Sequence, residues 1–213
     1  MLDLREIFLF KKHKYIVIDT EACNLNLVSR DNLPWQISWI ECKGEEILSE
    51  HDYFPFWKNL KVSKGAAIVT HFDYYDYKKK AIDPSIVLDD LIKYIENPEY
   101  FIVWHRGIGY DMQILRNFYE MCGREFPSES ILSRNIDTNC LSKAYIEEIA
   151  IPQNEDFLTW QYKLDNLIKK GLKTNIKRMC ELLGIPYNEN AHNAFHDIDM
   201  CKEIFIKLIY KLS

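Results

Sequence analysis

A short run of apolar residues near the N-terminus ends in two acids. Residues 15–18 read Tyr-Ile-Val-Ile, and Asp19-Thr20-Glu21 follows directly. A run of this length with β-branched residues is typical of a strand that is buried on both faces of an α/β sheet. Alternate residues of a strand point to the same face, so Asp19 and Glu21 are expected to present two carboxylates at the carboxyl end of this strand, where such sheets bind ligands.

The rest of the chain alternates between strand and helix patterns. An antiparallel hairpin and two further buried strands are predicted over residues 35–42 with 46–54, over 101–104 and around Ile136. Helices are predicted from Pro84, from Asp111 to Gly123, and over 164–170, 175–183 and 194–212. The polar stretch 149–160 is expected to be a loop. This order indicates an α/β sheet with an antiparallel edge and with the first strand in its middle.

Composition restricts the class of protein further. The 213 residues suit one domain, and 47% hydrophobic residues exclude a disordered chain. No apolar run approaches the ~20 residues of a membrane helix, and no secretory signal is evident, so we expect a soluble, cytoplasmic protein. The six cysteines form no Cys-x-x-Cys pair, which favours free thiols. The net charge of −5 argues against gripping nucleic acid by bulk positive charge, but not against a nuclease that holds phosphate through metal ions.

Two later segments add acids to the first pair. Adjacent carboxylates repel each other unless a cation holds them, and oxygen ligands favour Mg²⁺ or Mn²⁺, but a lone Asp-x-Glu also fits a solvated strand end. His105 follows the second buried strand, and Asp111 comes six residues later, where an acid is also a common helix N-cap. His192 precedes the last predicted helix, and Asp197 comes five residues later.

The spacing of His192 and Asp197 constrains where the histidine lies. Five residues turn a regular helix by about 500°, which would leave the two side chains on different faces. His192 is therefore expected on the loop before the first full turn. Its rival is His196, which forms a His-x-x-x-His pair with His192, although this pair lacks the Glu of the zinc signature. Asp199 is an alternative ligand to Asp197.

Four acids and a histidine thus stand in order along the chain: Asp19, Glu21, Asp111, His192 and Asp197. Together with His105 they resemble the motifs of the DEDDh family of 3′→5′ exonucleases, which includes proofreading subunits of replicative polymerases, ribonuclease T, oligoribonuclease and TREX-type enzymes. The resemblance runs from about residue 15 to residue 208 and takes in 35–37 and 62–67. It implies a ribonuclease-H-like α/β fold, a five-stranded mixed sheet with helices on both faces, in a single exonuclease domain over residues 1–213.

The resemblance also implies a two-metal-ion mechanism. Asp19, Glu21 and Asp197 would hold one Mg²⁺ or Mn²⁺ ion, and Asp19 with Asp111 would serve the second. His192 would be the general base, since an imidazole with a pKa near 6.5 can take a proton from water at neutral pH. The expected activity is the release of nucleoside 5′-monophosphates from single-stranded or frayed 3′ ends of DNA or RNA.

Expected substrate contacts follow from the same resemblance and from two departures from it. They are Ala22, Cys23, Leu25 (or Leu27), His105 and Arg106. Ala22-Cys23-Asn24 stands where the family usually has Thr-Thr-Gly, which affects how the terminal base is seated. Arg106 stands where the family usually has Asn, and it would contact a phosphate or form a surface salt bridge.

Two rival functions stay open. One is a phosphodiesterase that clears very short oligonucleotides, and the other is a nucleic-acid-binding module of the same fold without turnover. Residues 71–80 interleave aromatics and lysines, as in a stacking surface for single strands or in a solvated loop. Lysines and an arginine over 169–178 form a second basic face or serve solubility alone. A homodimer or a polymerase-type partner is compatible with the resemblance, and the sequence specifies neither.

Overall fold

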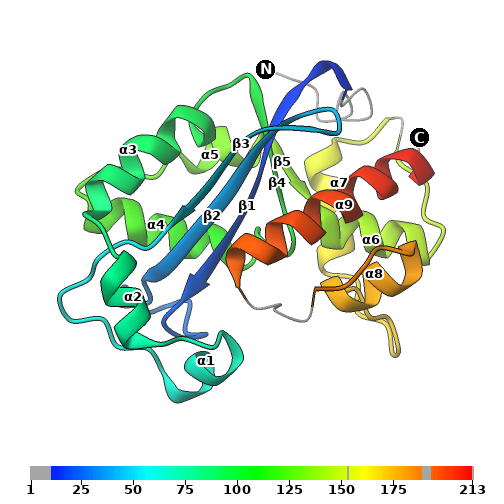
Figure 1. The fold of residues 1–213 in the computed structure, drawn as a ribbon. Helices are drawn as coiled ribbons and strands as arrows, with labels where there is room; N and C mark the ends of the chain where they lie inside the picture. The colour runs from blue at the N-terminus through cyan, green and yellow to red at the C-terminus, as the bar shows by residue number, and fades with distance from the viewer. Residues whose placement is uncertain (1–10, 153, 189–192, 213) are drawn as a thin grey trace.

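The computed structural model describes residues 11–152, 154–188 and 193–212. Its centre is a five-stranded mixed sheet in the order β3-β2-β1-β4-β5 (Figure 1). The strands are β1 Lys14–Ala22, β2 Pro34–Lys43, β3 Glu46–Tyr53, β4 Tyr100–Trp104 and β5 Asn135–Asp137. Neighbours β1, β2 and β3 pair antiparallel, whereas β4 pairs parallel with β1 and β5 with β4. The predicted fold class is confirmed, and β1 is the middle strand.

Helices cover both faces of the sheet because β1 is apolar on both sides. Tyr15 and Val17 are buried in one core, and Ile16 and Ile18 are buried in the other. The first core is closed by α6 Thr138–Ile146, α7 Phe157–Asp165, α8 Ile176–Leu183 and α9 Ala194–Leu212. The second core is closed by α3 Pro84–Ile95, α4 Asp111–Met121 and α5 Ser128–Leu132.

Residues 63–81 form two short helices, and the second of them lies within residues 71–80, for which the sequence suggested a stacking surface or a solvated loop. They are α1 Lys64–Val69 and α2 Tyr74–Lys80. Asp73 caps α2 by accepting a hydrogen bond from the backbone N–H of Asp76 at 2.8 Å. Tyr77 is 3% exposed and packs with Trp35 and Phe54 in a third, small core. The loop interpretation is therefore wrong, because a cap and one buried aromatic side chain hold α2 against the end of the sheet.

The expected loop at 149–160 and the expected helix at 164–170 are both wrong in part. The helix α7 begins at Phe157 and ends at Asp165. Asp156 caps it by accepting from the backbone N–H of Thr159 at 2.7 Å, and its apolar residues face the first core. The short α5 and the helix α6 were not predicted, and α6 is capped by Asp137, which accepts from the backbone N–H of Asn139 at 2.9 Å.

Other expected elements agree with the structure. The helix α3 begins at Pro84 behind its cap Asp83, and α8 follows the cap Asn175 and ends at Gly184, whose φ is +64°. All six cysteines are free thiols. Among the described helices, none combines the length and hydropathy that a membrane span requires.

A close approach of backbone to an indole fixes the loop between β4 and α4. A Cβ atom on Gly107 would lie 2.1 Å from ring carbons of Trp104, which is fully buried. No side chain larger than hydrogen fits there unless the ring moves. Gly109 in the same loop is open, since a Cβ atom there would lie 3.9 Å from its nearest neighbour, the Arg106 carbonyl oxygen.

We expect Gly107→Ala to lower the free energy of unfolding by about 1–3 kcal/mol, because the added methyl group overpacks the Trp104 site. Gly109→Ala, the matched control, should change it by no more than about 0.5 kcal/mol. Urea unfolding followed by tryptophan fluorescence measures both. Equal midpoints for the two variants would contradict the close approach.

Candidate active site

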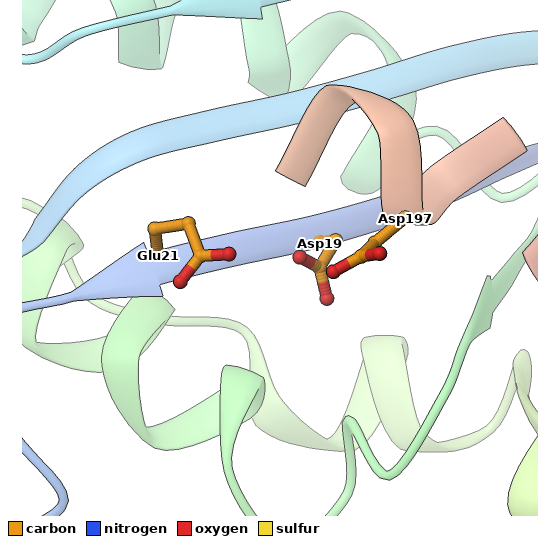
Figure 2. Close-up of side chains that lie close together, drawn as sticks. All are labelled: Asp19, Glu21 and Asp197. Carbon is orange, nitrogen blue, oxygen red and sulfur yellow. The ribbon is translucent and has the colours of Figure 1, made fainter. Parts of the chain in front are cut away.

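Three carboxylates converge at the carboxyl end of β1. Asp19 and Glu21 lie two residues apart on the strand, on the face that α9 covers, and Asp197 lies in the first turn of α9 (Figure 2). One oxygen of each carboxylate lies within 4.8 Å of the others. The packing of α9 against β1 therefore brings together acids that are far apart in the sequence.

Burial and mutual repulsion raise the pKa values of these acids. The pKa of Asp19 is well above its ordinary value, first because burial removes its carboxylate from water and then because Asp111, Glu21 and Asp197 lie close by. Burial and the neighbouring acids also raise the pKa of Glu21 well above its ordinary value. Buried like charges are costly unless positive charge compensates them. Because the donors are all carboxylate oxygens, the group fits a hard divalent cation such as Mg²⁺ or Mn²⁺.

Asp111 lies beside this group and is fixed by Thr20. It is the first residue of α4 and is 4% exposed. Its Oδ1 accepts hydrogen bonds from the backbone N–H of Thr20 at 3.0 Å and from Thr20 Oγ1 at 2.6 Å. Burial raises the pKa of Asp111 to about 6, and the two Thr20 donors oppose that rise. Since Thr20 lies between Asp19 and Glu21, the strand presents two acids on one face and holds Asp111 from the other.

Of the two candidate histidines, only His196 lies among the described residues. His192 lies outside them, so its assignment as the base stays a prediction, and so does the alternative of a zinc-binding pair. His196 is half-buried on α9, and the carboxylate group contains no histidine from the described part of the chain. Asp197 rather than Asp199 joins the acids, since the Asp199 side chain is 68% exposed and lies 3.9 Å from Lys202 Nζ.

The loop after β4 turns His105 inward. Its Nδ1 lies 2.8 Å from Thr138 Oγ1. Burial, and to a smaller extent the charge of Arg106, lowers the pKa of His105 to about 3, so the ring is neutral at pH 7. Arg106 has a φ of +64° and donates its backbone N–H to Asp137 Oδ1 at 2.9 Å. Its Nε donates to Asn139 Oδ1 at 3.4 Å, and Arg106 forms no ion pair within the described residues. Both interpretations of this arginine, a phosphate contact and a surface salt bridge, therefore stay predictions.

The segment after Glu21 has a buried part and an exposed part. Ala22 and Cys23 are 4% and 1% exposed, and the backbone N–H and thiol of Cys23 both donate to the Leu33 carbonyl oxygen, at 3.2 and 3.1 Å. Leu25 is 85% exposed, and Leu27 is half-buried. Of the side chains expected to support a terminal base, Leu25 is the one most open to a ligand.

Comparison with solved structures identifies the architecture. No protein-family model and no curated protein matches the sequence. E. coli exonuclease I in complex with a dA16 oligonucleotide matches with a TM-score of 0.73 and 15% identity, over 95% of this chain and 42% of that one. The fold is that of the matched part of exonuclease I. The same enzyme with a dT13 oligonucleotide gives a TM-score of 0.69 and 16% identity, over 91% of this chain and 40% of that one.

A zinc-bound exonuclease I complex with single-stranded DNA matches similarly, with a TM-score of 0.71, 16% identity and coverage of 94% and 41%. The chain thus spans about two fifths of the length of these structures. At such low identity the likeness to exonuclease I establishes the fold alone. It agrees with the ribonuclease-H-like sheet that the sequence resemblance implied.

Sequence reasoning missed the polar side chains that hold the start of α9 in this fold. Gln36 lies directly opposite Glu21 in the pairing of β1 with β2. Its Nε2 donates to Asp52 Oδ1 at 2.7 Å and to Asn193 Oδ1 at 3.3 Å. The Asn193 carbonyl oxygen in turn accepts from the backbone N–H of Asp197 at 3.0 Å. Gln36 therefore links β2, the neighbour of the strand that carries Glu21, to the helical turn that carries Asp197.

The raised pKa of Asp19 predicts how stability varies with pH. The charged form of Asp19 destabilises the fold. The stability that the protonated form contributes is therefore fully present below the unfolded pKa near 4, and it is lost as pH rises through the pKa of the folded state. In EDTA, Asp19→Asn should match the free energy of unfolding of the parent near or below pH 4 and exceed it by a margin that widens as pH rises from there, because the buried carboxylate of the parent must ionise beside its acidic neighbours. Urea unfolding across this range measures the difference. A gap that does not change with pH would contradict the prediction.

Divalent metal ions should make the parent, rather than Asp19→Asn, the more stable of the two proteins. If the three acids bind Mn²⁺ or Mg²⁺, the thermal midpoint of the parent should rise with metal concentration, because the folded state alone binds the ion. Asp19→Asn should respond weakly, whereas Asp199→Asn, an exposed acid outside the group, should respond like the parent. An equal rise in parent and Asp19→Asn would show that the metal binds elsewhere.

Proposed function

We propose that this chain is a metal-dependent 3′→5′ exonuclease that releases nucleoside 5′-monophosphates from single-stranded or frayed ends of DNA or RNA. The observation that carries the proposal is the group of Asp19, Glu21 and Asp197, with ligand oxygens within 4.8 Å of one another at the carboxyl end of β1. Support also comes from the exonuclease I fold, which is known in complexes with dT13 and dA16 oligonucleotides.

The metal-binding residues are assigned as the family resemblance implies, and the grouping of three of the acids supports the assignment. Asp19, Glu21 and Asp197 would hold one Mg²⁺ or Mn²⁺ ion, and Asp19 with Asp111 would serve a second. When bound, two such ions supply positive charge at the attacking and leaving oxygens of an in-line displacement at phosphorus. The hydrogen bonds from Thr20 would keep the Asp111 carboxylate in place whether or not metal is bound.

Other residues would move a proton and seat the substrate. His192 would accept the proton of the attacking water, since its ordinary pKa near 6.5 leaves much of it neutral at pH 7. Leu25 would cover the terminal base, and the backbone of Ala22 and Cys23 would support it. His105 would act through the loop that it anchors at Thr138, and this loop carries Arg106 toward the substrate.

The free 3′ end is the feature that tests the proposal most directly. A 3′-phosphate would bring extra negative charge to a site already lined by four acids, so a 3′-hydroxyl should be accepted and a 3′-phosphate resisted. A 5′-labelled single strand should shorten one nucleotide at a time with Mg²⁺ or Mn²⁺ and stay intact in EDTA. A covalently closed single-stranded circle should survive. Rapid cutting of the circle would exclude an exonuclease, and tight binding without a ladder under either metal would favour a binding module.

Two pairs of variants separate chemistry from binding. Asp19→Asn should abolish the ladder, and Asp199→Asn should leave it unchanged. His192→Ala should lower kcat by about 10²–10⁴ with little effect on binding, because a proton acceptor is lost and not a substrate contact. His196→Ala should have a much smaller effect on kcat. The reverse ranking of the two histidine variants would move the base to His196.

A further inference from the structure

A cavity of about 370 Å³ lies between the start of β2, the helix α2 and the start of α9, where His196 directly precedes Asp197 of the carboxylate group. Four aromatic residues border it, together with polar and charged residues. The aromatic residues are Trp35, Phe54, Phe72 and Tyr77, and the others include Lys80, Asn193 and His196. Apart from His196, the rival of His192 as the base, none of these side chains has a role in the two-metal chemistry, so the cavity is a feature that the proposed function does not yet use.

A β-bulge places Trp35 in this wall. In the pairing of β1 with β2, Glu21 lies opposite Gln36 and Ala22 lies opposite Pro34, so Trp35 has no partner on β1. A bulge of this kind can re-aim the side chain of the extra residue. The Trp35 indole is 5% exposed and lies 5.0 Å from Phe72 in an edge-on contact, between ring centroids. Trp35 at the bulge therefore directly precedes Gln36, the residue that lies opposite Glu21.

The positive charge at the cavity comes from Lys80. Its Nζ lies 4.8 Å from the centroid of the Phe54 ring, and it forms no ion pair with any described residue. The two acids that also border the cavity are engaged elsewhere. Asp73 accepts the capping hydrogen bond of α2, and Asp76 lies 3.8 Å from Lys79. Lys80 therefore remains available to a negatively charged ligand.

The cavity and the acids share the first turn of α9. His196 borders the cavity and directly precedes Asp197, and Asn193, also at the cavity, is held by Gln36. A strand whose phosphate reaches Asp19 and Asp197 would therefore pass the cavity with a neighbouring nucleotide. The volume suits one base with its sugar, and base-on-aromatic stacking tolerates any sequence because every base has a flat face.

We propose that this cavity binds an unpaired nucleobase next to the scissile phosphate, with Phe72 and Trp35 contacting the base and Lys80 the adjoining phosphate. This inference rests on the proposed function and deepens it. A base in a duplex is already stacked and paired, so such a subsite selects single-stranded ends by admitting only a base that is free to leave its neighbours.

An abasic scan tests the subsite. Short 5′-labelled oligothymidylates, each with one abasic nucleotide at a different position from the 3′ end, are bound to the full chain with Ca²⁺ in place of Mg²⁺. For the parent, removing the base at one position should weaken binding about tenfold or more. For Phe72→Leu, which keeps an apolar side chain without a flat face, intact strands should bind more weakly and that one position should lose its special effect. Lys80→Ala should reduce the salt dependence of binding.

Tyr75→Ala and Lys79→Ala are the matched controls, since both side chains lie on α2, are exposed, and do not border the cavity. Both controls should bind like the parent. Two outcomes would overturn the subsite. In one, Phe72→Leu weakens binding by the same factor whichever nucleotide is abasic; in the other, Tyr75→Ala weakens binding as Phe72→Leu does.

The same strands are also incubated with Mg²⁺, to measure shortening. If the strands shorten but Phe72→Leu does not remove the effect of the one abasic position, the subsite alone is rejected. If Phe72→Leu does remove it but no strand shortens, the exonuclease alone is rejected. Neither binding nor shortening by the parent rejects both.

Discussion

Repulsion among carboxylates at the end of one strand is the constraint around which this molecule is arranged. Asp19 and Glu21 share a face of β1, and burial makes their negative charge costly. Apolar packing of α9 on the same face adds a third acid, Asp197. The apolar cores must therefore supply the free energy that holds these like charges together, which isolated acids in water would not tolerate.

Polar contacts then fix the acids from both sides of the sheet. Thr20 points away from its two acidic neighbours and holds Asp111 at the start of α4. Gln36, opposite Glu21, holds Asn193 at the start of α9. Each of these contacts joins a strand to the first turn of a helix, so the geometry of the site depends on how the helices begin and not on a flexible loop.

The sheet and much of the site could be predicted from the sequence because their signals are local. Apolar runs identify β1 and β4, the alternating residues identify the hairpin, and Asn175 with Gly184 delimits α8. The helix α7 was misplaced because the stretch before Phe157 is polar and its cap, Asp156, resembles a loop residue. The helix α2 was missed because its stability comes from Tyr77 packing on Trp35 and Phe54, which are distant in sequence. The bulge at Trp35 depends on strand register, and the contact of Gln36 with Asn193 joins residues 157 positions apart, so neither leaves a sequence pattern.

The length of α9 has a consequence for motion. The helix carries Asp197 near its start. The side chains of Ile198, the next residue, and of Leu208, near the end of the helix, are both fully buried in the same core. Fraying from either end of α9 frees few residues before it reaches these buried positions. Hydrogen exchange along the buried part of α9 should therefore require cooperative opening of the fold. By contrast, α1 buries no residue and α2 buries only Tyr77. Within the described residues, native-state fluctuations near the acids should therefore be concentrated in the α1–α2 segment, while Asp197 should exchange with the slow, buried part of α9.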